Sequence, residues 1–440
     1  MTIYTTTLKR QLLQDLLDDF NDSSNYYFVG IARSQLWNDS DETVSVTNSV
    51  RDIREFRENL QGVKAISGAS FVIPRYNWTS GTVYRSWDDN SVDHPGNGFY
   101  VLSSLNHVYV CIQQGKNSQG VAVPSTVEPT GTSTSVLSTG DGYVWKYMYS
   151  LDALELSRFV SAGYIPVSRI DSSDGSVRET AQVAVQNAAT AGEVLGIAIT
   201  DGGSGYASAP TVSVIGDGDS AAATATVFGG SVVKVEMTNR GSGYSNASIS
   251  FSTGNATARA ILSEDSGMGS NPIRDLKSHS VMFNGRPDGT EGGELLVNQS
   301  FRQTGLTKNM KIPVTDSDFT GSAGSTLRRL TFTPGATAFT AGNLIIGSTS
   351  EAKAFVDFAD SAAGVWYHQT DSSGYGVFQT GETLTSQNRS GVVVTGTATL
   401  DSDQVASVDK YSGDVLYISN HASITRSASE TQDIKLIVRL

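Results

Sequence analysis

The sequence predicts a mainly β protein, with β-sandwich-like sheets, a few helices and an α+β arrangement at the N-terminus. Glycine is common, at 44 residues against 10 prolines, and Ser and Thr are abundant throughout the chain. Short runs of β-branched and aromatic residues alternate with such turn-forming residues, which is typical of strands joined by turns. Two internal repeats of a strand, a turn and a strand lie in the second half of the chain.

Two helices are expected near the N-terminus. Residues 7–20 place apolar side chains on one stripe at helical spacing, and residues 25–32 that follow read as a buried strand. A second helix is expected at about 49–61, with Ser49 or Thr47 as its N-cap and Gly62 as its terminator. The stripe of the first helix consists of Leu8, Leu12, Leu13, Leu16, Leu17 and Phe20.

Strands and turns are expected from about 70 to 170. Residues 99–102 and 107–112 flank Ser103–Asn106, which predicts a hairpin. The turn Gly140–Gly142 leads into a strand with Trp145, Tyr147 and Tyr149 on one face. A short helix is expected near 152–160.

The repeats define two further segments. Leu195–Tyr206 is echoed by Val233–Tyr244, and each copy runs from an alternating strand into a Gly-Ser-Gly-Tyr turn that needs positive φ angles. A weaker strand–turn–strand repeat lies between about 325 and 400. We therefore expect an N-terminal helix (1–24), a discontinuous β-rich core (25–185, 266–312 and 403–440) and two inserted β modules, at 190–265 and 313–402.

Composition narrows the function. The formal net charge is -13, which disfavours binding to nucleic acid because phosphates are repelled. No stretch approaches the roughly 18 apolar residues of a membrane span, and the N-terminus lacks the apolar core of a signal peptide. The single cysteine, Cys111, lies in an apolar run and reads as a small buried side chain.

No constellation of catalytic or metal-binding residues emerges from the sequence. The five histidines show no metal-ligand spacing. Gly202–Gly205 and Gly241–Gly243 precede strands and therefore read as turns, and the acidic pairs Asp88–Asp89 and Asp217–Asp219 read as solvated loop charge. The prediction is a protein that is not an enzyme and has no cofactor, no metal and no small-molecule substrate.

Seven segments of the chain share the order of the motifs of a known family. The segments are Val29–Trp37, Val72–Trp78, Tyr109–Ile112, Gly140–Tyr147, Ser300–Gln303, Ser412–Ile418 and Thr431–Val438. They resemble the baseplate wedge subunit (gene-eight product type) of T-even-like contractile-tailed bacteriophages, the myoviruses. The match covers about half the chain, and the two β modules depart from the family pattern.

The resemblance implies a structural protein of the virion that forms a homodimer and is built, with other baseplate wedge proteins, into each of six wedges of the tail baseplate. Assembly would take place in the cytoplasm of the host bacterium. The chemistry of that task is binding through large, specific surfaces. The framework candidates are Arg33, Trp37, Arg75, Trp78 and Trp145, as core or as interface, with both arginines able to fork onto carboxylates or carbonyls that fix loops.

Two other functions remain open at this point. A receptor- or carbohydrate-binding tail protein would present the rings of Tyr206 and Tyr244 to sugars. A secreted polysaccharide hydrolase of β architecture would need a cleft with two carboxylates about 5 to 10 Å apart, and the sequence selects no such pair.

Overall fold

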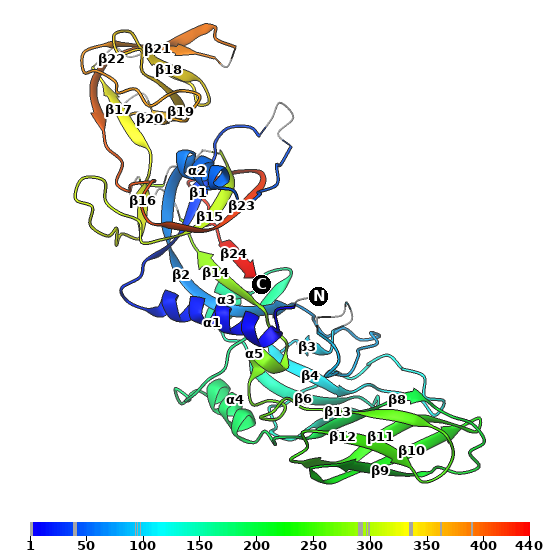
Figure 1. The fold of residues 1–440 in the computed structure, drawn as a ribbon. Coiled ribbons are helices and arrows are strands. Elements are labelled where there is room, and N and C mark those ends of the chain that lie inside the picture. The colour runs from blue at the N-terminus through cyan, green and yellow to red at the C-terminus, as the bar shows by residue number, and fades with distance from the viewer. Residues whose placement is uncertain are drawn as a thin grey trace. The chain divides into compact units, whose positions relative to one another are not determined.

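The protein is mainly β, as the sequence predicts, in a computed structural model (Figure 1). Its helices among the described residues are α1 (Thr6–Asn21), α2 (Val50–Glu58), α3 (Ala153–Phe159), α4 (Val177–Asn187) and α5 (Pro272–Asp275). The structure describes residues 3–37, 42–92, 94, 96, 98–288, 294, 295, 297, 300–333, 338–360, 363–388 and 390–440.

The chain forms two compact units. The first comprises Met1–Leu13, Ser70–Val281 and Arg439–Leu440, and the second comprises Gln14–Ala69 and Met282–Val438. Residues of the segments that we assigned to one discontinuous core therefore fall in both units, and their assignment to a single core stays a prediction. Each inserted module belongs to a single unit.

The largest sheet has eight strands, in the order β23-β15-β1-β2-β14-β24, with β7 and β16 each paired to β2. Its strands come from distant parts of the chain, so chain order gives no hint of strand order. They are β1 (Tyr27–Ala32), β2 (Leu60–Pro74), β7 (Tyr164–Pro166), β14 (Ser280–Gly285), β15 (Ser300–Lys308), β16 (Ala323–Ser325), β23 (Asp414–Thr425) and β24 (Ile434–Arg439).

Helix α2 packs its one large ring against a pair of glycines in this sheet. Gly30 of β1 lies opposite Gly305 of β15. A Cβ atom would meet the Phe56 ring at 3.2 Å from Gly30 and at 2.5 Å from Gly305. Phe56 is 0% exposed, so the two glycines make the hollow that seats the helix.

The capped start of α2 agrees with the sequence, but its end does not. Ser49 is the N-cap and forms a capping box with Asp52. The helix ends at Glu58, earlier than the predicted stop at Gly62. Gly62 lies inside β2, where a Cβ atom would come within 2.5 Å of Leu295; the glycine serves close packing and not helix termination.

The apolar stripe of α1 is narrower than predicted. Leu13 and Leu17 are buried, whereas Leu8 and Leu12 are 43% and 51% exposed. The predicted helix is confirmed, but its apolar stripe packs against other parts of the chain only from Leu13 onwards.

A four-stranded sheet, in the order β3-β4-β6-β5, lies in the first unit. The predicted hairpin is confirmed by the pairing of Leu102 with Val108, and α3 falls where a short helix was expected. Helix α4 was missed, although Ser176 accepts a hydrogen bond from the Glu179 N–H as its N-cap. The strands are β3 (Tyr100–Leu102), β4 (His107–Gln113), β5 (Leu137–Ser138) and β6 (Val144–Ser150).

The first repeat folds into a six-stranded sheet with internal pseudo-symmetry, in the order β11-β10-β9-β12-β13-β8. The first copy supplies β8, β9 and β10, the second β11, β12 and β13, and the first strand of each copy pairs with the third strand of the other. The strands are β8 (Val194–Asp201), β9 (Thr211–Gly216), β10 (Asp219–Phe228), β11 (Ser231–Ser242), β12 (Ala247–Phe251) and β13 (Thr257–Leu262). We call this the repeat module.

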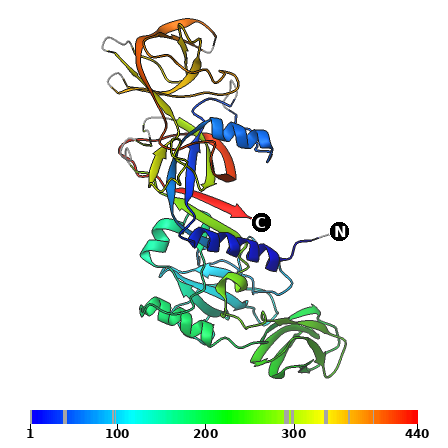
Figure 2. The same ribbon diagram turned by 60° about the vertical axis from the view of Figure 1, so that its left-hand side comes forward.

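The second inserted segment contains a closed barrel, in the order β17-β20-β19-β18-β21-β22, which is the yellow-to-orange body in Figure 2. The weak repeat predicted four strands there, and the structure has six. Closure pairs every strand on both edges. The strands are β17 (Arg328–Phe332), β18 (Leu344–Gly347), β19 (Lys353–Asp360), β20 (Gly364–His368), β21 (Thr383–Gln387) and β22 (Val393–Gln404).

Candidate interface framework

The segment Gly140–Tyr147, one of the seven that carry the resemblance, contains a turn that is fastened by the carboxylate of Asp141. This carboxylate accepts hydrogen bonds from the backbone N–H groups of Thr126 and Val127 at 2.7 and 3.0 Å. It also accepts from the hydroxyls of Ser125 at 3.0 Å and Thr139 at 2.5 Å. Burial raises the pKa of Asp141, but these hydrogen bonds outweigh burial and lower the pKa to about 2. The sequence indicated the turn, but it did not indicate that the Asp141 carboxylate would fasten the turn to neighbouring backbone.

Trp145 and Trp78 belong to the core of the first unit. Trp145 is 0% exposed and stacks on Tyr143 with ring centroids 5.6 Å apart. Trp78 is half-buried, packs against the same cluster and donates from its indole N–H to the Ser125 hydroxyl at 3.2 Å. Their part in a framework is therefore to hold strands and loops together, by burial and ring packing.

Arg75 fixes a loop, in the manner the sequence suggested. Its guanidinium donates to the Asn77 side-chain oxygen at 2.9 Å and to the Ser161 carbonyl at 3.1 Å. These two hydrogen bonds of the Arg75 guanidinium thus link the end of β2 to the segment between α3 and β7. No carboxylate takes part in these two bonds.

Arg33 and Trp37 form a stacked pair on the loop after β1. The Arg33 guanidinium carbon lies 4.2 Å from the centroid of the Trp37 ring, and the guanidinium donates to the Leu36 carbonyl at 3.3 Å. The Trp37 indole N–H donates to the His421 carbonyl at 3.4 Å. Both side chains are half-buried. Of the five candidates, this cation–π pair has the composition most often found at the centre of protein interfaces.

Tyr206 and Tyr244 hold the two copies of the repeat module together. The Tyr206 hydroxyl accepts from the Ala256 N–H at 2.9 Å, and the Tyr244 hydroxyl accepts from the Ala221 N–H at 3.4 Å. Each ring thus reaches into the other copy. Tyr206 and Tyr244 are only 7% and 6% exposed, so neither ring presents an open face on which a sugar could stack.

The seven candidates do not form one site. Arg33 and Trp37 lie in the second unit, and the other five lie in the first. Only Trp78 and Trp145 share a buried cluster. The sequence identified residues that are important to packing, but it could not say which of them would meet.

The acidic pair Asp88–Asp89 is not the free loop charge that we expected. Arg259 of β13 contacts Asp88 at 2.5 Å and Asp89 at 2.6 Å, and the Leu262 N–H donates to Asp89 at 3.0 Å. This forked ion pair fastens the repeat module to the loop before β3. The arginine lies far along the chain, so no local pattern could have indicated the pairing.

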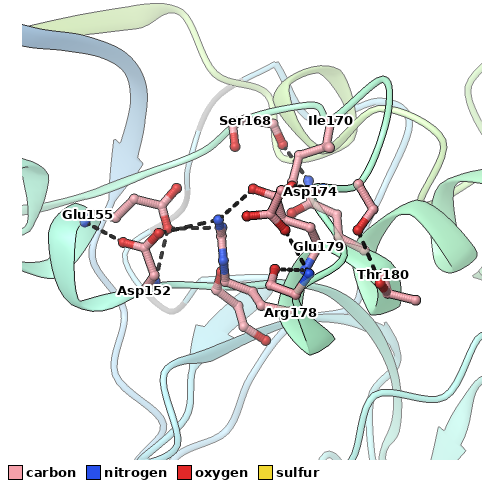
Figure 3. A network of polar contacts seen from close by, with 12 residues as sticks. Asp152, Glu155, Ser168, Ile170, Asp174, Arg178, Glu179 and Thr180 are labelled. Atoms are coloured by element: carbon pink, nitrogen blue, oxygen red, sulfur yellow. Dashed lines mark hydrogen bonds and ion pairs between the residues drawn. The ribbon is translucent and has the colours of Figure 1, made fainter.

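Arg178 is the centre of a further polar network, drawn in Figure 3. Its guanidinium contacts Glu179 at 2.9 Å and both Asp152 and Glu155 at 3.2 Å. Asp152 is the N-cap of α3, so Arg178 links the first turns of α3 and α4. Burial raises the pKa of Glu155. Because these carboxylates are engaged with one cation and with backbone N–H groups, the network serves structure.

Three features of the described residues bear on metal binding and on chemical reactivity. They contain no group of three or more His, Cys, Asp or Glu side chains arranged to hold a metal ion. A groove of about 410 Å³ lies between β8, β11 and the end of β4. Its two carboxylates are engaged: Glu236 pairs with Lys234 at 2.8 Å, and Asp88 pairs with Arg259. Burial raises the pKa of the Cys111 thiol, which disfavours the reactive thiolate.

No protein-family model matches this chain, and no curated protein matches it either. Within the described residues, no helix has both the length and the apolar composition needed to cross a lipid bilayer.

Proposed function

We propose that this chain is a structural, non-enzymatic subunit of the baseplate wedge of a contractile phage tail, where it forms a homodimer and binds other wedge proteins. One observation carries the proposal. Of the seven segments that resemble the wedge family, five supply strands to the single eight-stranded sheet, namely β1, β2, β15, β23 and β24. The other two segments supply β4 and β6 of the four-stranded sheet.

A sheet built from remote segments of the chain suits a protein to which other subunits bind. A sheet whose strands come from remote segments unfolds only when many long-range contacts break together, which gives a stiff support for binding surfaces. Trp145, Tyr206 and Tyr244 are buried in the first unit, so they pack its interior and do not form an exposed binding surface. The exposed contacts must then come from other residues, and the half-buried Arg33–Trp37 pair is the first candidate among them.

Light scattering of the purified chain tests the dimer directly. The proposal expects a particle of twice the chain mass of 46.7 kDa across micromolar concentrations. The variant Trp37→Ala should shift the equilibrium towards monomer, whereas Trp78→Ala should lower the unfolding temperature instead. A wild-type chain that stays monomeric throughout that range would count against the dimer.

Imaging of intact tails tests the location. Particles produced without this chain should lack an ordered baseplate, and a tag fused to it should appear in six-fold positions around the tail hub. Tails that assemble fully and attach to cells in its absence would contradict a role in the wedge.

A further inference from the structure

Four polar side chains join the barrel to the loop that follows β1. Asp357 of β19 contacts the Nδ1 atom of His368, at the end of β20, through Oδ2 at 2.6 Å. Its other oxygen accepts from the Ser34 hydroxyl at 2.6 Å. The Nε2 atom of His368 contacts the Gln35 amide nitrogen at 3.1 Å. All four residues belong to the second unit, and we call this set the barrel clamp.

The clamp is buried, and each half depends on the other. Asp357 and His368 are both 2% exposed. The barrel satisfies one oxygen of Asp357 and one ring nitrogen of His368, and the loop satisfies the remaining oxygen and nitrogen. If the loop withdrew, a buried carboxylate oxygen and a buried imidazole nitrogen would be left without partners or would have to take up water, which is costly.

Both sides of the clamp sit at departures from regular backbone. The pairing of β19 with β20 shifts register between Val356 and Phe358, so Asp357 is the extra residue of a β-bulge. On the loop side, Arg33 adopts a left-handed conformation with φ 63° just before Ser34. Bulges re-aim side chains, and strained residues persist where the surroundings hold them. Two such departures that converge on one contact indicate a built feature.

The closed ring of the barrel and its buried core contain neither Ser34 nor Gln35. Its ring of strands is closed, and it has its own buried cluster, which includes Leu330, Ile345 and Leu384. It is joined to the rest of the unit by two segments that lie together, since the N–H groups of Ser407 and Val408 both donate to the Ser325 carbonyl. A compact body on two adjacent connections can turn unless another contact stops it.

We propose that the barrel clamp is a releasable lock that holds the barrel in one orientation, and that opening it lets the barrel turn about the segments next to Ser325 and Ser407. A second contact supports the closed state: the hydroxyl of Tyr375 donates to Glu58 at 2.6 Å, but Tyr375 is 51% exposed. Water replaces an exposed contact more easily than a buried one. The clamp is therefore expected to hold the orientation more firmly than the Tyr375 contact does. This inference does not depend on the wedge assignment.

Spin labels measure the orientation. Val50 of α2 and Val393 of β22 are 76% and 66% exposed, so cysteines there accept labels, whereas Cys111 is buried and does not. The wild-type background should give one narrow distance distribution. Ser34→Ala and Asp357→Asn should each replace it with a broad one, and Tyr375→Phe should change it least.

Two further readouts separate release from unfolding. Amide exchange at Arg33, whose N–H donates to the Asn59 carbonyl at 2.9 Å next to the clamp, should rise about tenfold or more in Ser34→Ala, the factor expected when a hydrogen bond to a buried carboxylate is lost, while exchange in β18 and β21 stays unchanged. Ser372→Ala, which removes an exposed barrel hydroxyl, is the matched control. If Asp357→Asn unfolds the barrel, Ser34→Ala still decides, because it alters only the loop side. A distance distribution that stays narrow in Ser34→Ala overturns the proposal.

Discussion

The repeat module and the barrel are both small β bodies of six strands, but they are stabilised differently. The repeat module leaves β8 and β11 as edge strands and joins its two copies through Tyr206 and Tyr244. The barrel closes its ring and buries a continuous cluster of apolar side chains, which includes Val356, Tyr367 and Leu400. The first relies on interlocking turns, and the second relies on closure.

The comparison extends to the carboxylates that hold their turns. Exposed Asp217 of the repeat module accepts from the N–H groups of Ser245 and Asn246. Buried Glu382 of the barrel accepts from the N–H groups of Ser350 and Gln379. In both modules a carboxylate accepts hydrogen bonds from backbone N–H groups, but it is exposed to water in the repeat module and buried in the barrel. The contribution of these bonds to the free energy of unfolding should therefore differ.

The largest effect is expected where a repeat-module glycine faces a ring. Gly254 and Gly205 share a φ of 77°. A Cβ atom at Gly254 would lie 2.3 Å from the Tyr206 ring, whereas one at Gly205 meets nothing within 4 Å. Gly254→Ala should lower the free energy of unfolding of the module by about 3 kcal/mol or more, from overpacking plus backbone strain. Gly205→Ala, the matched control, should cost about 1 kcal/mol. Equal losses in urea unfolding would show that the ring contact contributes little.

The next effect concerns the barrel turn. Burial raises the pKa of Glu382, but hydrogen bonds from Ser350 and Gln379 outweigh it, so the pKa lies below its ordinary value of 4.5. A depressed carboxyl pKa gives stability that is present above pH 4.5 and is lost as the pH falls through the folded-state pKa. Glu382→Gln should cost about 2–3 kcal/mol at pH 7 and flatten the acid limb of barrel unfolding. Amide exchange of β18 and β21 at several pH values measures both the stability lost at pH 7 and the steepness of the acid limb. An acid limb as steep in the variant as in the wild type would contradict this.

A smaller effect tests the pseudo-symmetry of the repeat module. Tyr206→Phe removes the acceptor of the Ala256 N–H at 2.9 Å, and Tyr244→Phe removes that of the Ala221 N–H at 3.4 Å. The shorter bond should matter more, so Tyr206→Phe should cost about 1 kcal/mol and Tyr244→Phe less. Thermal unfolding of the two single variants compares them. The reverse order would show that the two copies are less alike in energy than in geometry.

The smallest effect is expected at Asp217. Its hydrogen bonds from Ser245 and Asn246 lower its pKa to about 2, so their contribution is present above pH 3.8, the ordinary value, and is lost as the pH falls towards 2. Asp217→Asn should speed amide exchange at Ser245 and Asn246 without unfolding the module. Added salt should weaken the wild-type contribution, because the carboxylate is exposed. An effect as large as that of Glu382→Gln would remove the contrast between the two modules.

Local signals in the sequence predicted elements well and contacts poorly. The N-cap of α2 was narrowed to Ser49 or Thr47, and the structure has Ser49. The apolar run of β1 and the hairpin at Ser103–Asn106 were placed correctly, because caps, periodicity and turns act over a few residues. Helix α4 was also within reach, since Ser176 and Glu179 have capping-box spacing. The sequence could not predict the Asp88–Arg259 ion pair or the barrel clamp, because the residues that form them lie far apart along the chain.

The sequence by itself determined that this protein is mainly β, where its first helices begin, and that one module is built from two copies with glycines at matching positive φ. Only the tertiary structure decided the strand order of the large sheet, the closure of the barrel, and the burial of Trp145, Tyr206 and Tyr244. The reason is physical. Backbone preferences are local and leave a readable pattern, whereas strand pairing and burial depend on contacts between residues that the chain brings together only when it folds.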